Sequence, residues 1–402
     1  MTTTINNEHK KLNVPNLRFP EFKGEWKKCI LGDITENFNL RNKDKIQYPM
    51  FSVTNDRGFV PQSEQFEGRD MVGEDIKAYK IIHTNDFAYN PARINVGSIA
   101  MYTGEKPCMI SSLYVCFKTT KEVNNEWLMQ LLKTPKMNYY YNVNGEGGVR
   151  VYLFYPNFAR IRMSIPKIEE QKKIAKLLNL IDERIATQNK IIEDLKKLKS
   201  AIIENVFDDK HSERLQLDNV GSYIRGLTYS SNDVVEHGGT LVMRSNNIVN
   251  GSLLDYNNNV VFVNKKMSAE QQLQNGDIVI CMANGSSSLV GKSSFYDGNC
   301  HSPITVGAFC GIYRSKEPIV KWLFQTNKYR RYIWNSLQGG NGAIANLNGE
   351  DILNMSFSIP NAPIKDTCVK MLTSVDSALE NNMSLCALYT LQKQHLLRQM
   401  FI

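Results

Sequence analysis

The residues of this 402-residue chain that could do chemistry are arginine, asparagine, lysine and serine side chains in predicted loops. Arginine can donate two hydrogen bonds to guanine and asparagine can pair with adenine, whereas lysine and serine suit phosphate oxygens. Asparagine and serine also favour turns, so any single one is equally well explained by backbone geometry. Their clustering in corresponding loops of two parts of the chain favours a nucleic-acid surface. The candidate contacts are Asn55, Arg57, Asn90, Arg93, Asn95, Arg150 and Tyr152, followed by Arg244, Ser245, Asn246, Asn247, Asn284, Ser286, Lys292, Asn341 and Asn346.

Known catalytic motifs do not fit the sequence. Residues 285–293 approach the phosphate-binding loop, but five residues separate Gly285 from Gly291, and no helical pattern follows. A phosphate cradle needs a helix N-terminus, so we expect a hairpin there. Asn90-Pro91-Ala92-Arg93 lacks the aromatic residue with which adenine methyltransferases stack on a flipped base. The eight cysteines include no CxxC pair, so free thiols are expected. The sequence therefore predicts no catalytic site, and no metal or cofactor bound by this chain.

The chain repeats itself at a constant interval. The run Arg-Met-Ser-Ile-Pro at 162–166 corresponds to Ser-Phe-Ser-Ile-Pro at 356–360, and a long helical pattern follows each run. Both patterns end in phenylalanine, and the interval from Phe207 to Phe401 equals the interval from Pro166 to Pro360. Such self-similarity predicts a duplicated architecture.

Each helical pattern carries apolar residues in alternating steps of three and four, which is typical of a coiled-coil seam. Both patterns are interrupted at the same two places, by the amides Gln188 and Asn382 and by the lysines Lys199 and Lys393. Two surface helices packed on separate domains would need no such run, so we expect the two helices to pair antiparallel. The predicted seam is Ile174, Leu178, Ile181, Ile185, Gln188, Ile192, Leu195, Lys199, Ile202 and Val206, facing Cys368, Leu372, Val375, Leu379, Asn382, Cys386, Tyr389, Lys393, Leu396 and Met400.

Strand-like runs and shorter helical patterns precede each long helix. The helical patterns cover Asn125–Met137 and Ile319–Ser336, and the strand-like runs include Leu113–Phe117, Val149–Phe154 and Thr305–Tyr313. The expected fold class is therefore α/β (α+β), with two globular modules and two long antiparallel helices. The predicted parts are an N-terminal arm (1–20), a first module (21–166), a first spacer helix (167–207), a second module (208–362) and a second spacer helix (363–402).

Charge and hydropathy limit the class of protein. The net charge is +8, and 42% of the residues are hydrophobic, which suits packed cores. Residues 1–166 carry 22 basic and 17 acidic residues, whereas the second module carries 13 of each, so any DNA contact by the second module must rest on a local group of basic residues. No apolar run is long enough to span a membrane, and the polar N-terminus does not read as a secretory signal. The expected compartment is the cytoplasm.

The order of these parts resembles that of the specificity (S) subunits of type I restriction–modification systems. The resemblance rests on Ile165-Pro-Lys-Ile-Glu-Glu-Gln-Lys-Lys-Ile-Ala175 followed by Ile181-Asp182, and on Leu17-Arg-Phe-Pro-Glu-Phe22 with Trp26 and Leu31-Gly-Asp-Ile34. It covers essentially the whole chain. The second copy departs from this pattern, because residues 360–366 lack the Glu-Gln pair. It keeps a counterpart of Ile181-Asp182, namely Val375-Asp376.

The resemblance implies that recognition, methylation and cleavage belong to different subunits. Each module would be a target recognition domain that reads one half of a split site in double-stranded DNA, and the coiled coil would set the gap. Two modification subunits would bring S-adenosylmethionine and the methylating site, and two restriction subunits would use ATP and Mg to translocate and cleave. The S subunit itself would catalyse nothing. Two other hypotheses stay open from the residues alone: a stand-alone nucleic-acid enzyme with an unrecognised nuclease or nucleotide site, and a protein-binding scaffold without a DNA role.

The two seam amides generate a first prediction. A hydrogen bond between Gln188 and Asn382 would hold the register of the helices at some cost in stability, as buried amides do in coiled coils. Replacing both by leucine should therefore raise the midpoint of thermal unfolding and loosen the register. An unchanged midpoint would count against pairing of the two helices.

Overall fold

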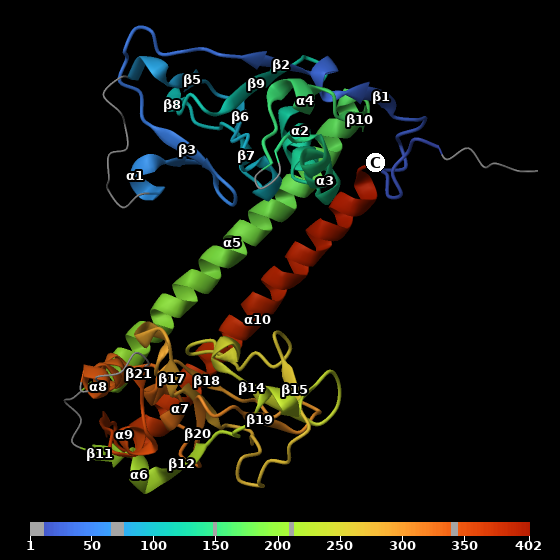
Figure 1. The fold of residues 1–402 in the computed structure, drawn as a ribbon. Coiled ribbons are helices and arrows are strands. Elements are labelled where there is room, and N and C mark those ends of the chain that lie inside the picture. Colours follow the sequence, from blue (N-terminus) through green and yellow to red (C-terminus); the bar gives the residue numbers. More distant parts are fainter. Residues whose placement is uncertain (1–11, 66–75, 148–150, 209–212, 339–344) are drawn as a thin grey trace, which may run out of the picture. The chain divides into compact units, whose positions relative to one another are not determined.

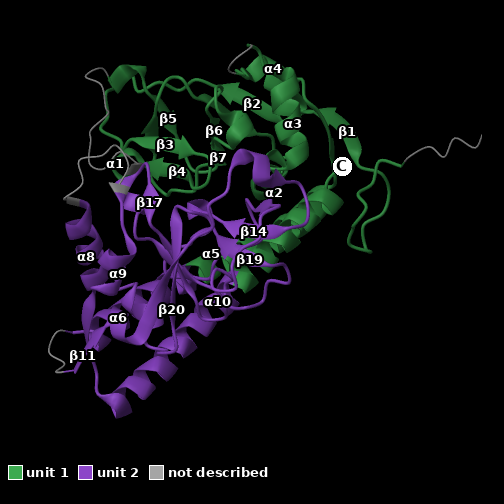
Figure 2. Cartoon of the chain, turned by 60° about the horizontal axis from the view of Figure 1, so that its bottom comes forward, with its two compact units in different colours: residues 1–189, 384–402 green, residues 190–383 purple. Residues whose placement is uncertain are grey.

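The computed structural model describes residues 12–65, 76–147, 151–208, 213–338 and 345–402, which form short strands, short helices and two long helices (Figure 1). The chain divides into two compact units (Figure 2). Unit 1 comprises residues 1–189 and 384–402, and unit 2 comprises residues 190–383. Each unit therefore contains one module, part of the first long helix and part of the second.

The first module is built on a four-stranded antiparallel sheet. Its strand order is β2-β9-β6-β7, formed by Thr35–Phe38, Val115–Thr119, Phe87–Tyr89 and Ile99–Met101. Phe87 lies opposite Phe117 in the β6–β9 register, and the two rings stack with centroids 4.9 Å apart. This stacked pair belongs to a buried core that also contains Trp26, Trp127 and Phe158. Burial of these large aromatic side chains is the main stabilising contribution to the module.

The other elements of the first module surround this sheet. Two antiparallel ribbons are β3 (Phe51–Thr54) with β4 (Gly58–Pro61), and β5 (Lys80–Ile82) with β8 (Cys108–Ile110). A third ribbon pairs β1 (Lys27–Ile30) with β10 (Arg162–Ile165), which leads into the first long helix. The short helices are α1 (Gln62–Gln65), α2 (Asn125–Leu132), α3 (Pro135–Asn144) and α4 (Tyr155–Ala159).

The second module repeats the sheet of the first with the same strand order. The order β12-β20-β16-β18 is formed by Gly221–Arg225, Cys310–Ser315, Ile278–Cys281 and Ser293–Phe295, again all antiparallel. Two modules with low overall sequence likeness thus share one hydrogen-bonding plan, which agrees with the duplication seen in the sequence.

A second sheet and several shorter elements complete this module. The sheet has the order β13-β15-β14-β19, formed by Val234–Val235, Val261–Val263, Thr240–Met243 and Ile304–Val306, with β14 and β19 parallel. Two ribbons pair β17 (Ala283–Asn284) with β21 (Ala345–Asn346) and β11 (Glu213–Gln216) with β22 (Ser356–Ile359). The short helices are α6 (Leu217–Val220), α7 (Val320–Leu323), α8 (Asn327–Gln338) and α9 (Gly349–Leu353).

Both helical patterns that precede the long helices are split in two, where the sequence predicted one helix each. In the first module the break falls at Pro135, which lacks an N–H and disfavours helical geometry in the residue before it. Thr134 then begins α3, and its hydroxyl accepts a hydrogen bond from the Met137 N–H. In the second module the Thr326 hydroxyl accepts from the Tyr329 N–H in the same way.

Two predicted strands also differ from the structure. The run Thr305–Tyr313 is two strands, β19 and β20, interrupted by a turn at residues 307–309. Of the run Val149–Phe154, residues 149–150 lie outside the described residues, and the rest makes only an isolated bridge between Tyr152 and Glu146. Apolar residues in these runs are therefore not all strand residues facing a core.

The two long helices contact each other in antiparallel fashion within each unit. The first, α5, spans Ile168–Val206, and the second, α10, spans Ala362–Met400. In unit 1 the start of α5 meets the end of α10, because Lys393 Nζ lies 2.6 Å from Asp182 Oδ1, and the Cys386 thiol lies 3.3 Å from Asn189 Oδ1. In unit 2 the end of α5 meets the start of α10, where Lys199 Nζ lies 2.7 Å from Asp376 Oδ1. All the predicted seam residues are buried or half-buried.

Each unit's core is completed by the ends of both long helices. In unit 1, Phe401 at the end of α10 stacks on Trp127 with centroids 5.9 Å apart. In unit 2, Phe207 at the end of α5 belongs to the buried cluster that contains Trp322 and Leu372. The two phenylalanines that the sequence placed at equivalent positions of the repeat thus fill the same role in the two cores.

The Glu-Gln pair at the start of α5 has a structural role in unit 1. Glu170 accepts two hydrogen bonds of 2.8 Å from the Arg18 guanidinium and one of 3.2 Å from the Trp26 indole N–H. Gln171 accepts from the Asn124 N–H. This pair therefore ties the start of the helix to the segment before the module and to the module itself. The start of α10 lacks it and instead forms a Lys365–Glu317 ion pair of 3.2 Å.

The buried lysine of unit 2 generates a prediction about stability. Asp376 accepts from Lys199, from Lys321 at 2.9 Å and from the Trp322 indole N–H at 3.1 Å, and the Lys199 and Asp376 side chains are only 8% and 6% exposed. Burial lowers the pKa of Lys199, which shows how little water reaches it. Asp376→Ala should cost about 3–5 kcal/mol in the free energy of unfolding, measured with urea, because it leaves a charged amine buried without its partner.

Two further variants control this measurement. Glu193→Ala removes an exposed helix ion pair with Lys197 and should change stability little. The double substitution Lys199→Met with Asp376→Leu should recover much of the loss, because an apolar pair of similar volume needs no compensation for buried charge. Equal losses from Asp376→Ala and Glu193→Ala would contradict the role given to the buried pair.

Candidate nucleic-acid interface

The first module carries a hollow of about 840 Å³ at the end of β6, here called the first hollow. Four of the predicted contacts lie in it: Asn90, Arg93, Asn95 and Tyr152. The Arg93 and Tyr152 side chains are exposed. The residues that line it are Asn90, Pro91, Ala92, Arg93, Asn95, Val96, Leu113, Val151, Tyr152 and Phe154.

Local hydrogen bonds hold the polar side chains of the first hollow. The Asn90 side-chain oxygen accepts from the Ala92 N–H at 3.0 Å, so this amide stabilises the turn that follows β6. The Asn95 side-chain amide donates to the Asn142 side-chain oxygen at 3.0 Å. The Leu153 N–H donates to the Pro91 carbonyl, which holds the neighbouring Tyr152 beside the same turn. The hollow is therefore shaped before any ligand arrives.

The hairpin with Asn55 and Arg57 approaches the edge of this hollow. Gly97 has a φ of 101°, and a Cβ added there would lie 3.1 Å from the Asn55 carbonyl oxygen. Glycine is required because the turn is left-handed and the hairpin backbone comes so close. Both Asn55 and Arg57 are exposed, and Arg57 lies 3.9 Å from the exposed Glu64 carboxylate. The structure thus brings six of the first module's candidates to one region.

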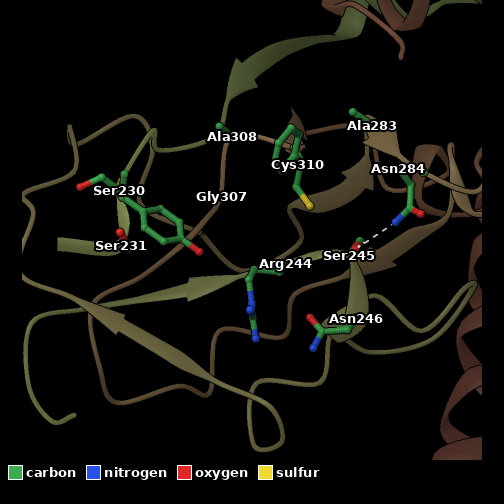
Figure 3. Close-up of a pocket in the computed structure, with 13 residues that line it drawn as sticks. Ser230, Ser231, Arg244, Ser245, Asn246, Ala283, Asn284, Gly307, Ala308 and Cys310 are labelled. Atoms are coloured by element: carbon green, nitrogen blue, oxygen red, sulfur yellow. Dashed lines mark hydrogen bonds between the residues drawn. The ribbon is translucent and has the colours of Figure 1, made fainter. Parts of the chain in front are cut away.

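The second module carries a hollow of about 610 Å³ at the end of β16, here called the second hollow. Figure 3 shows Arg244, Ser245 and Asn246 on one side of it and Asn284 on another, where the Asn284 amide donates to the Ser245 hydroxyl at 3.2 Å. All four were predicted contacts. The residues that line the hollow are Tyr229, Ser230, Ser231, Arg244, Ser245, Asn246, Ala283, Asn284, Gly285, Gly307, Ala308, Phe309 and Cys310.

Arg244 is the main charged group of the second hollow. One of its terminal nitrogens donates to the Asn259 carbonyl at 3.1 Å, which orients the guanidinium. Its Nε is buried and has no hydrogen-bond partner among the described residues. A buried donor without a partner is costly, so the surrounding contacts must hold the Arg244 side chain in this position.

The other candidates of the second module lie elsewhere. Asn247 is fully buried, and its amide bonds to the Arg244 N–H and to the carbonyls of residues 255 and 258, so its role is structural. Lys292 lines a separate small hollow with Arg330 and Trp334. Ser286 and Asn346 are exposed. Arg150 and Asn341 lie outside the described residues.

The two hollows occupy equivalent places in the two modules. Each lies where the third strand of the four-stranded sheet ends and beside the turn that enters the second strand of that sheet. The Leu153–Pro91 hydrogen bond of the first module has its counterpart in the bond from the Leu347 N–H to the Met282 carbonyl, and the two leucines stand at equivalent positions of the repeat. None of the described residues that line either hollow is aspartate or glutamate.

Three features of the described ranges bear on whether the hollows could do chemistry. They contain no cluster of histidine, cysteine and carboxylate groups that could hold a metal ion. Burial raises the pKa of the Cys310 thiol, which lines the second hollow, to about 12, so this thiol stays protonated and a poor nucleophile. The stretch that approached a phosphate-binding loop leads into strand β18 and not into a helix. No described helix is long and apolar enough to cross a bilayer.

Sequence reasoning missed several lining residues. Tyr229, Leu113 and Phe309 were not among the candidates, although all three line the hollows. Leu113 and Phe309 looked like strand residues because they stand in apolar runs. The turn at residues 307–309 and the start of β9 at Val115 place both side chains outside the sheet.

Part of the chain is similar to a known family of domains. Residues 23–197 match the model of the type I restriction modification DNA specificity domain. The chain is 35% identical over 155 residues to the type I restriction enzyme EcoKI specificity subunit of Escherichia coli, covering 36% of this chain and 31% of that protein. It is 34% identical over 153 residues to the StySPI specificity subunit of Salmonella potsdam, covering 36% and 31%. The chain spans no more than half the length of the curated relatives that it matches.

Solved structures show the same fold over nearly the whole chain. The S subunit of the type I restriction–modification system of M. genitalium superposes with a TM-score of 0.61 over 97% of this chain and 99% of that one, at 13% identity. A chain from a structure on the assembly of a type I restriction–modification system gives a TM-score of 0.51 over 92% and 96%. The fold is that of two modules with two antiparallel long helices. Residues 23–197 thus resemble the specificity domain of type I restriction–modification systems, and the whole chain has the fold of their S subunits.

The arginines of the two modules generate a prediction about DNA. If Arg57 and Arg244 bind base edges, Arg57→Ala and Arg244→Ala should each weaken binding to the cognate site by about 1–3 kcal/mol and leave binding to random DNA nearly unchanged. Fluorescence anisotropy with both duplexes measures this difference. Arg331→Ala, an exposed arginine outside the hollows, is the matched control. Equal losses on both duplexes would instead assign the two arginines to phosphate contacts.

Proposed function

We propose that this chain is the DNA-recognition subunit of a type I restriction–modification complex, in which each module reads one half of a bipartite site. The observation that carries this proposal is the equivalence of the two hollows. Both hollows lie at the same place of the four-stranded sheet and combine an arginine with asparagine side chains, although Arg93 follows β6 and Arg244 follows β14 of the second sheet, and neither has a carboxylate among its described lining residues. Arginine and asparagine are suited to base edges, and a lining without carboxylates does not repel phosphate.

The long helices are suited to set the gap between the two half-sites. A helix of 39 residues is about 58 Å long at 1.5 Å per residue, which exceeds one turn of DNA at about 34 Å. Ion pairs between the two helices oppose sliding in both units, and the pair in unit 2 is buried. Two modules on such a spacer would read two unrelated short sequences separated by bases that are not read.

The reaction chemistry would belong to partner subunits. We propose that two modification subunits dock on this chain and carry S-adenosylmethionine and the methylating site. Two restriction subunits would add ATP- and Mg-dependent translocation and cleavage. The chain itself would hold no cofactor and catalyse nothing, and the complex would act in the cytoplasm. The fold of the family and the match to the specificity domain support this assignment.

Mapping of methylated adenines in cells that carry this chain with its modification subunits tests the proposal. A single bipartite motif with a constant gap is the expected result, and footprinting of the complex should protect two short patches around an unprotected gap. Hydrolysis of ATP or cleavage of DNA by the purified chain would support a stand-alone enzyme. Assembly with modification subunits without any footprint would support a scaffold that does not read DNA.

The spacer generates a prediction about the gap. Inserting one heptad into α5 within 171–206, together with one heptad at the facing position of α10, should lengthen the unread gap and leave both half-site sequences unchanged. Seven residues extend a helix by about 10 Å, so the gap should grow by no more than about three base pairs of 3.4 Å each. Methylation mapping reads both quantities at once. Altered half-site sequences with an unchanged gap would refute the assignment of the helices as the spacer.

A further inference from the structure

The two hollows share a large apolar side chain that points out of the fold. Leu113 in the first hollow is 78% exposed, and Phe309 in the second is 67% exposed. Leu113 stands two residues before β9 and Phe309 stands immediately before β20, and these strands hold the same place in the two sheets. Solitary exposed apolar residues are common on protein surfaces, but their recurrence beside the same strand of a duplicated fold calls for a physical reason.

Both apolar side chains stand on turns that are held rigidly. The Phe309 carbonyl accepts hydrogen bonds from the Met282 N–H at 2.9 Å and from the Ala283 N–H at 3.1 Å, and Cys310 beside it is fully buried. The turn with Leu113 is held through the next residue, Tyr114. Lys80 Nζ donates to the Tyr114 carbonyl at 2.6 Å, and the Tyr114 hydroxyl accepts a hydrogen bond from the Val53 N–H. A projecting side chain on a fixed turn loses little backbone entropy when it enters a partner.

The surroundings of these side chains favour nucleic acid as the partner. Arg93 lines the hollow with Leu113, and Arg244 lines the hollow with Phe309, each with asparagine side chains and without carboxylates among the described lining residues. The contrast within the second module is clear, because a neighbouring hollow of about 460 Å³ beside α7 and α10 is lined by four carboxylates. Charge complementarity therefore distinguishes the two recognition hollows from this acidic hollow.

Aromatic side chains next to Leu113 would extend the apolar contact. Tyr152 and Phe154 are 38% and 48% exposed, and their rings stack with centroids 6.3 Å apart and planes 14° apart. Together with Leu113 they present a small apolar surface beside Arg93. Flat rings and a branched aliphatic group suit the faces of nucleobases, which become accessible only when a base step opens.

We propose that Leu113 and Phe309 are wedge residues that enter the DNA between adjacent bases, one in each half-site. This inference rests on the proposed function, because it assigns part of the recognition to the opening of a base step. Leucine and phenylalanine are side chains with which DNA-bending proteins unstack a step. Unstacking is least costly at flexible pyrimidine–purine steps, so each wedge adds sequence preference at a position without a hydrogen bond to a base edge.

The test places 2-aminopurine, whose fluorescence rises when it unstacks, at each step of the mapped half-sites. The full chain assembled with its modification subunits should raise the fluorescence at one step in each half-site. Leu113→Ala should abolish the rise in one half-site and Phe309→Ala in the other, and each should weaken binding about tenfold. Phe309→Leu should keep the rise, because leucine can also act as a wedge.

Matched controls use exposed apolar residues of the same modules outside the hollows. Leu40→Ala and Val249→Ala, both at positions 44% exposed, should leave both fluorescence signals and the affinity unchanged. Wild-type complex that protects the mapped site without a fluorescence rise would overturn the wedge and leave the proposed function standing. Failure of Leu113→Ala or Phe309→Ala chains to co-purify with the modification subunits would also overturn it, by assigning these residues to a protein interface. A wild-type complex that does not protect the mapped site would refute the proposed function itself.

Discussion

A lysine that reaches a carboxylate across an antiparallel helix pair is the constraint on which the rest of the structure depends, and in unit 2 this pair is buried. Lys199 meets Asp376 in unit 2, and Lys393 meets Asp182 in unit 1. Both the lysines and the aspartates stand at equivalent positions of the repeat, so the same device occurs twice. A buried charge without its partner is costly, and any other register of the helices would separate these groups. The pairs therefore select one alignment of α5 with α10, where apolar side chains alone would tolerate several.

The two modules share one fold but differ in the side chains of the loops at the strand ends. The strand order, the aromatic cores and the hydrogen bonds of Leu153 and Leu347 recur in both. Individual positions at the loops differ between the modules, since Tyr152 corresponds to Asn346 and Leu113 to Phe309. Packing density constrains a core residue on all sides, whereas a side chain at a turn can change without loss of stability. Under the proposed function, such a division would let one fold read two unrelated sequences.

The long-range organisation was predictable from the sequence, whereas several local features were not. The constant repeat interval and the interrupted seam predicted two modules and paired helices, because a heptad pattern needs no knowledge of distant contacts. The prediction of one helix over Asn125–Met137 was wrong at Pro135, where the chain turns. The prediction of one strand over Thr305–Tyr313 was wrong because a turn directs Phe309 outward. The DNA-contact role of the loop residues stays a prediction, except that Asn247 is buried and structural.

The sequence by itself determined the duplication, the position of the seam and the residue types available for recognition, because these follow from periodicity and composition along the chain. Tertiary structure decided which aspartate each seam lysine meets, and it gathered Arg244, Asn284 and Phe309 around one hollow from three separate strand ends. It also separated Lys292 from that group. The physical reason is that strand pairing brings residues together across tens of positions, and no local pattern encodes which turns will meet.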